Sequence, residues 1–121
     1  MYITHYKDLT VWQKSMQLVK EIYNITKNLP KEELYGLSNQ MQRAAVSIPS
    51  NIAEGHARNG KKEFVRFLSI AVGSKAELQT QLQICVDIGY FTELDMNSAM
   101  SLSEEIGKML HSMIKKLTPD H

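Results

Sequence analysis

Apolar residues recur at steps of three and four along nearly the whole chain, which is the spacing that gives an α-helix one hydrophobic face. Four such segments are separated by short stretches of turn residues, and none alternates as a β-strand does. Long amphipathic helices with short connections predict an all-α fold, an antiparallel up-down-up-down four-helix bundle, with residues 1–121 as one domain. The expected helices run from about Thr10 to Leu29, from Ser38 to Gly55, from Asn59 or Gly60 to a stop at residues 87–90, and from Thr92 onward.

Residues near the expected helix ends predict how those ends are closed. Ser38 is the expected N-cap of the second helix. Thr92 is the expected N-cap of the fourth, with Asp95 in the position that completes a capping box. Inside the third helix, Gly73 and Ser74 predict that another helix backbone comes close.

The second helix carries a proline in its interior. Pro49 has no N–H for the Ala45 carbonyl, and an interior proline costs a helix roughly 3 kcal/mol. We therefore expect a kink there. Short polar side chains within one turn, at Ser47, Asn51 and Glu54, are expected to form a structural cluster that satisfies the freed backbone groups.

The same cluster raises the alternative of a small enzyme that uses Ser47, Asn51 and Glu54. No Lys or His is spaced to act as the base of such a site, so the structural interpretation is favoured and no catalytic residue is assigned. Cys85 falls at a core position of the third helix, where a lone cysteine usually acts as a small hydrophobic residue.

Three runs of sequence resemble one known family: Asp8–Lys14, Gln40–Gly55 around the interior proline, and Phe64–Leu78. The chain resembles the four-helix-bundle proteins that are encoded in bacterial ribosomal RNA intervening sequences, whose functions are mostly unknown. The resemblance implies a ring-like homo-oligomer, with a pentamer as one form. A similar branch contains the accessory proteins of diversity-generating retroelements, which bind a reverse transcriptase and nucleic acid through a basic oligomer surface.

Composition narrows the location and the cofactors that we expect. No apolar run approaches the roughly 20 residues that cross a bilayer, and the first residues lack a signal-peptide pattern, so a cytoplasmic protein without membrane contact is expected. The four histidines, His5, His56, His111 and His121, lie in separate regions without a second ligand at helical spacing. We therefore expect neither a metal site nor a cofactor.

The net charge of +1 conceals an uneven distribution along the chain. Residues 38–75 hold six basic residues against two acidic ones, and residues 76–121 hold three against seven. The candidate nucleic-acid site is a basic ridge at the start of the third helix, made of Arg58, Lys61, Lys62 and Arg66, with Arg43 upstream.

The two lysines of the ridge break a local rule. Lys61 and Lys62 fall in the first turn of the third helix, where the helix dipole disfavours cations by roughly 0.3–1 kcal/mol each. Such violations occur at functional sites. The alternative is an ordinary solvated surface, because no aromatic residue interleaves the ridge as base-stacking sites usually require.

These observations favour a non-enzymatic oligomeric scaffold or adaptor that binds nucleic acid or a nucleic-acid-bound protein. The alternative is a module that binds only a partner protein, through the fourth helix or the oligomer edge. Trp12 and Tyr23 are interpreted first as packing residues and then as subunit-contact anchors. Four of the seven methionines lie in the fourth helix, where they fill a core or form an adaptable partner surface: Met96, Met100, Met109 and Met113.

Overall fold

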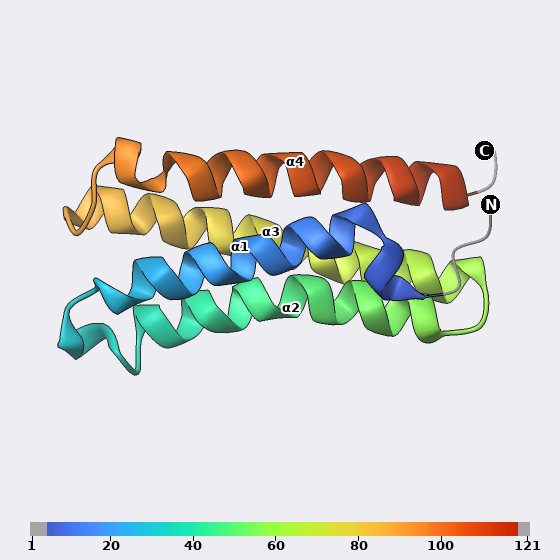
Figure 1. Cartoon of the computed structure of the whole chain (residues 1–121), viewed down its shortest axis with the longest axis horizontal. Helices are drawn as coiled ribbons and strands as arrows, with labels where there is room; N and C mark the ends of the chain where they lie inside the picture. The colour runs from blue at the N-terminus through green and yellow to red at the C-terminus, as the bar shows by residue number, and fades with distance from the viewer. Residues whose placement is uncertain (1–4, 119–121) are drawn as a thin grey trace.

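A computed structural model describes residues 5–118 and contains four long α-helices, with no strand among those residues (Figure 1). This confirms the expected all-helical four-helix fold. Short 3-10 turns precede the first helix, at Tyr6–Asp8 (η1), and lie between the first two, at Lys31–Glu33 (η2). The helices are α1 at Thr10–Lys27, α2 at Leu37–Ala57, α3 at Lys61–Ile88 and α4 at Glu93–Leu117.

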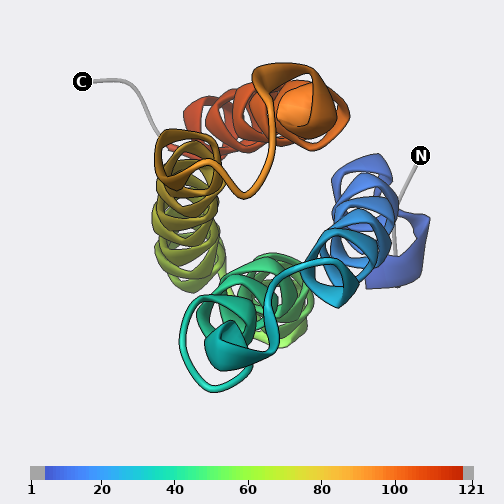
Figure 2. The same ribbon diagram turned by 90° about the vertical axis from the view of Figure 1, so that its left-hand side faces the viewer.

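Side-chain contacts fix how neighbouring helices run. Between α2 and α3, the Ser47 hydroxyl lies 2.8 Å from that of Ser74, and Met41 meets Cys85 with their sulfur atoms 3.8 Å apart. Residue numbers rise in one helix as they fall in the other, so these two helices run in opposite directions. Seen from its end in Figure 2, the bundle has α1, α2, α3 and α4 in that order around a common centre.

The centre of the bundle is filled by one apolar stripe from each helix, as the periodicity predicts. Complete burial of a leucine or isoleucine side chain contributes about 1.5–3 kcal/mol, so these stripes are the main source of stability. The largest fully buried side chains are Leu18 and Ile22 of α1, Met41, Ile48 and Ile52 of α2, Leu68, Leu78 and Leu82 of α3, and Ile106 and Leu110 of α4.

The capping box at the start of α4 is confirmed. The Thr92 hydroxyl accepts from the Asp95 N–H at 3.1 Å, and the Asp95 carboxylate accepts from the Thr92 N–H at 2.9 Å. The expected Ser38 cap is wrong, because α2 begins one residue earlier at Leu37 and buries Ser38 in its first turn. The Gln40 N–H, to which a Ser38 cap would bind, donates instead to the Gly36 carbonyl at 3.0 Å, and the Glu33 carboxylate accepts from the Leu37 N–H at 3.3 Å.

The close approach expected at Gly73 is also wrong. A Cβ added to Gly73 would have no atom within 4 Å, because this residue faces solvent. The tight glycines are Gly55, where an added Cβ would lie 2.6 Å from the Cβ of Phe67, and Gly107, where it would lie 2.8 Å from Cε of Lys75. Gly55 does not stop α2 either, since the helix continues to Ala57.

Pro49 is buried within α2, which remains one helix from Leu37 to Ala57. A kink at this position stays a prediction. Within residues 5–118, no helix combines the length and the apolarity that a bilayer span requires.

Candidate nucleic-acid interface

The basic ridge lies at the corner where α2 ends and α3 begins. The corner is tight because Gly55 has no side chain, which lets α2 approach Phe67 and Phe64 of α3. The connection then turns through Gly60, whose φ of +100° suits glycine and disfavours other residues. This geometry brings the end of α2 and the first two turns of α3 onto one surface.

Two arginines of the ridge converge on one aromatic ring. The guanidinium carbon of Arg58 lies 5.0 Å from the Phe67 ring centroid, and that of Arg66 lies 4.7 Å from it. Arg58 pairs with Glu54 at 2.8 Å, and Arg66 pairs with Glu63 at 3.2 Å. Their positive charges are therefore partly balanced, and each side chain is restrained by two contacts.

An aromatic residue thus lies beneath the ridge, although not one that a base can reach. Phe67 is only 6% exposed and lies beneath the two arginines, so its own ring is closed to a base. The sequence pattern did not predict this contact, because Phe67 falls at core spacing in α3. No local signal indicates that the Arg58 side chain reaches across the connection to the Phe67 ring.

Lys61 and Lys62 occupy the first turn of α3, as expected, and both are exposed. Neither forms an ion pair with any residue between 5 and 118, and no side chain caps this helix start. They border a recess of about 390 Å³ that Val65, Leu117 and Thr118 also line. Within the ridge, the charges of these two lysines are thus the ones available to an anionic partner.

The remaining candidate, Arg43, does not join the ridge. It lines a separate groove between α1 and α2, with Tyr23 and Val46 among its neighbours. At about 1.5 Å per residue, Arg43 is about 22 Å along α2 from Arg58. The ridge as the structure assembles it consists of Arg58, Lys61, Lys62 and Arg66.

The predicted polar cluster divides into two parts. The Asn51 amide donates to the Ser47 carbonyl at 2.8 Å and to the Ser47 hydroxyl at 2.9 Å, and that hydroxyl also contacts Ser74. The Glu54 carboxylate instead accepts from Arg58 at the corner between α2 and α3, which we call the basic corner because the ridge lies there. Within residues 5–118, none of the bonds from these side chains reaches the Ala45 carbonyl. Ser47 links α2 to α3, Asn51 holds the Ser47 hydroxyl, and neither satisfies the carbonyl that Pro49 leaves free.

Charge is distributed between the two ends of the bundle. Figure 1 places the α2–α3 connection and the C-terminal end of α4 at one end, and the other two connections at the opposite end. The two ends of the bundle carry opposite charge, although they do not coincide with the basic and acidic stretches of the sequence. The first end carries Arg58, Lys61, Lys62, Arg66, Lys115 and Lys116 against Glu54 and Glu63, and the opposite end carries Glu32, Glu33, Asp87, Glu93 and Asp95 against Lys27 and Lys31.

A groove along α1 and α2, called the apolar groove below, has one mainly apolar hollow and one lined by both polar and apolar residues. Three of its large side chains are well exposed for apolar residues: Met16 at 38%, Tyr23 at 42% and Val46 at 39%. Exposed aromatic and apolar residues in one groove are typical of contact surfaces. Its two hollows, of about 310 and 380 Å³, are lined by Tyr6, Trp12, Met16, Val19, Val46, Pro49, Ser50 and Ala53, and by Tyr23, Asn39, Gln42, Arg43, Val46 and Ser47.

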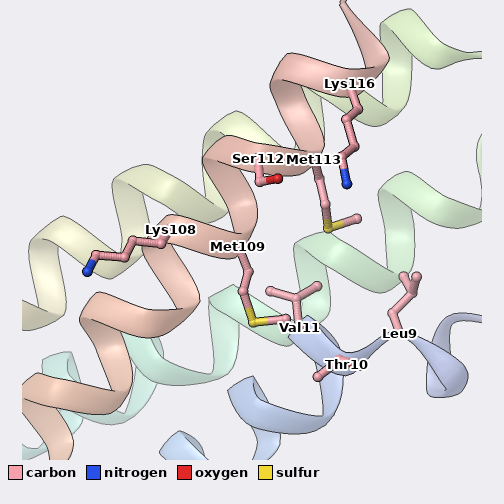
Figure 3. Close-up of a pocket in the computed structure, with 8 residues that line it drawn as sticks. All are labelled: Leu9, Thr10, Val11, Lys108, Met109, Ser112, Met113 and Lys116. Atoms are coloured by element: carbon pink, nitrogen blue, oxygen red, sulfur yellow. The ribbon is translucent and has the colours of Figure 1, made fainter.

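A second groove, of about 350 Å³, separates the start of α1 from the end of α4 (Figure 3). Met109 and Met113 of α4 face Val11 and Leu9 across it, while Lys116 points into it. Two of the methionines that the sequence indicated for a partner surface therefore line a groove, whereas Met96 is buried in the core.

Among the side chains that the structure describes, Cys85 and Tyr90 have clearly shifted pKa values. Burial, followed by the nearby Glu33 carboxylate, raises the pKa of the Cys85 thiol. The hydrogen bond from the Tyr90 hydroxyl to Glu33, 2.6 Å long, is the main cause that raises the pKa of Tyr90. A buried thiol held in its neutral form is a poor nucleophile.

Histidines His5, His56 and His111 stay in separate places, and His121 lies outside the described residues. Across residues 5–118, no three side chains of His, Cys, Asp or Glu gather closely enough to hold a metal ion.

Comparison with known proteins identifies relatives of the whole bundle. The family model described as 23S rRNA-intervening sequence protein matches residues 7–112. A crystal structure of a protein of unknown function from the S23 ribosomal protein family of Bacteroides thetaiotaomicron VPI-5482 superposes with a TM-score of 0.81. The two chains are 30% identical, and the alignment covers 88% of this chain and 99% of that one. No curated protein matches this chain.

Proposed function

The chain belongs to the 23S rRNA-intervening sequence protein family, and we propose that it is a non-enzymatic, homo-oligomeric adaptor that binds nucleic acid at its basic end. The same surface would hold a partner protein that carries nucleic acid. The observation that carries this proposal is the position of Lys61 and Lys62. Both are unpaired within residues 5–118, in a helix turn that disfavours cations, at the end of the bundle where positive charge gathers.

Phosphate groups are the ligands that such a turn favours. The free N–H groups at the start of α3 and the two ammonium groups would all face the same anion. A phosphate there would offset the repulsion between the lysines and the helix dipole.

The test is fluorescence anisotropy of a labelled structured RNA, titrated with the protein at about 50 and about 200 mM salt. Binding is expected at the lower salt and should weaken steeply at the higher. Replacing both lysines, Lys61→Glu with Lys62→Glu, should abolish it without unfolding the bundle, because glutamate suits the first turn of a helix. The matched control is Lys27→Glu with Lys31→Glu, the same charge change at the acidic end. Equal binding by the wild type and the Lys61/Lys62 variant would refute the proposal.

The homo-oligomer is proposed to form through the apolar groove of α1 and α2. A groove that exposes Met16, Tyr23 and Val46 suits a second protein surface better than water. Light scattering should show an assembly, and Val46→Glu should dissociate it. Ile70→Glu is the control, because Ile70 is equally exposed, at 41%, on α3. A pentamer is one form to be tested by the measured mass.

A protein-only interaction module is the second candidate, and the groove between α1 and α4 favours it. Methionines give that groove an adaptable apolar floor, and Lys108 and Lys116 add positive charge at its rim, which suits an acidic partner segment. Under this alternative, Met109→Glu would abolish capture of a partner protein, while Lys61→Glu with Lys62→Glu would leave it unchanged.

A further inference from the structure

The two arginines of the basic corner are arranged differently from its two lysines. Each guanidinium is placed over the Phe67 ring and tied to a carboxylate. The side chains nevertheless stay 48% exposed at Arg58 and 58% exposed at Arg66. Each guanidinium therefore lies against the ring while much of its side chain remains open to a ligand from solvent.

Because Glu54 and Glu63 balance the two arginines, they add little to the attraction for phosphate. If the arginines served only to shield the Phe67 ring from water, planar groups would not be needed, because the aliphatic part of a lysine side chain covers apolar surfaces as well. Guanidinium planes are instead surfaces on which the unstacked bases of RNA are known to stack.

We infer that Arg58 and Arg66 form a stacking platform for unpaired nucleobases, so that the basic end selects single-stranded nucleic acid over duplex. This inference rests on the proposed function, in which Lys61 and Lys62 bind the phosphates of the same strand. Bases inside a duplex are already stacked on each other and offer no free face to the platform.

The platform is also held in place before any ligand arrives. Phe67 lies beneath it at 6% exposure, and the close approach at Gly55 fixes Phe67 against α2. A stacking group whose rotamer is already fixed loses less conformational entropy on binding. Stacking of one base on an aromatic side chain is worth about 5- to 150-fold in affinity; with the lower end of that range for each guanidinium, the two arginines together should give at least a tenfold preference for a single strand.

The experiment compares a labelled 12-nucleotide single-stranded RNA with the same strand in a duplex, across a range of salt concentrations. The critical variant is Arg58→Lys with Arg66→Lys, which keeps both charges and removes both planes. It should lose about tenfold in affinity for the single strand at every salt concentration, with the slope of log K against log salt unchanged. Lys61→Gln with Lys62→Gln is the contrasting variant, because losing two phosphate contacts should lower the salt slope by about 1.4 for a single strand.

Each outcome decides a different question. Equal wild-type affinity for single strand and duplex, or single-strand affinity within twofold of wild type in the arginine variant, overturns the stacking platform and leaves the phosphate site standing. No wild-type binding to either probe at about 50 mM salt overturns the proposed function and the platform with it. If the double variant loses helicity, Arg66→Lys alone serves, since Arg66 is exposed and its partner Glu63 lies on the same helix.

Discussion

The three glycines inside the helices provide a test of the packing at the basic corner. Replacing each with alanine adds the same methyl group and the same gain in helix propensity, about 1 kcal/mol. Only the surroundings differ. Gly73 has open space around it, Gly107 faces the end of the Lys75 side chain, and Gly55 faces the Cβ of Phe67 at 2.6 Å.

The magnitudes follow from what must move. At Gly73 nothing moves, so Gly73→Ala should stabilise the bundle by about 1 kcal/mol. At Gly107 the flexible end of Lys75 must shift, which should cancel most of that gain. At Gly55 the obstacle is a Cβ joined directly to the α3 backbone, so two helices must separate at a cost of about 1–3 kcal/mol. After the propensity gain, Gly55→Ala should lose about 1 kcal/mol net.

Thermal unfolding followed by circular dichroism measures the series, and about 4 °C per kcal/mol is expected for a chain of this size. The order of melting temperatures should be Gly73→Ala highest, then Gly107→Ala, with Gly55→Ala below the wild type. A rise for Gly55→Ala equal to that for Gly73→Ala would refute the tight corner. Gly55→Ala should also weaken single-strand RNA binding under the stacking proposal, because it displaces Phe67 from beneath the arginines.

Three further predictions concern single side chains. Thr92→Ala removes the hydroxyl of the capping box and should cost about 1 kcal/mol in urea unfolding, whereas Thr92→Ser should retain most of the stability. The hydrogen bond to Glu33 raises the pKa of Tyr90 in the folded protein. The stabilisation from this bond is therefore present below the ordinary tyrosine pKa and is lost as pH rises through the folded pKa. Tyr90→Phe should remove this loss and flatten the alkaline end of the pH–stability curve. The buried Cys85 thiol should react with a thiol reagent only after denaturation, and rapid labelling of the native protein would contradict its burial.

The helices could be predicted from the sequence because the apolar periodicity and the Thr92 capping box each depend only on residues a few positions apart. Glycine roles could not. Gly73, Gly55 and Gly107 all stand within helical segments, and only the neighbouring helix decides which of them is crowded. The Ser38 cap failed because the helix starts earlier than the polar residue suggests: the Gln40 N–H already bonds to the Gly36 carbonyl.

The candidate site divides in the same way. Helical spacing was sufficient to group Lys61, Lys62 and Arg66, because they share the first two turns of one helix. The contact of Arg58 with the Phe67 ring depends on how the chain turns at Gly60, and spacing carries no information about that path. Arg43 was grouped with them because it is basic and belongs to the same basic stretch of sequence, although helix geometry places it about four turns of α2 from Arg58.

The separation of charge along the bundle axis connects the two proposed surfaces, because assembly through one would bring copies of the other together. The apolar groove follows the length of α1 and α2, whereas the basic corner lies at one end of the bundle. If copies join through the groove around a rotation axis parallel to the bundles, every basic end lies on the same face of the ring. A chain of net charge +1 would then present several copies of Lys61 and Lys62 to one strand, and the linked contacts would strengthen one another. Val46→Glu should therefore weaken RNA binding even though it leaves the lysines intact, and unchanged affinity in a dissociated Val46→Glu protein would show that a single subunit carries the whole site.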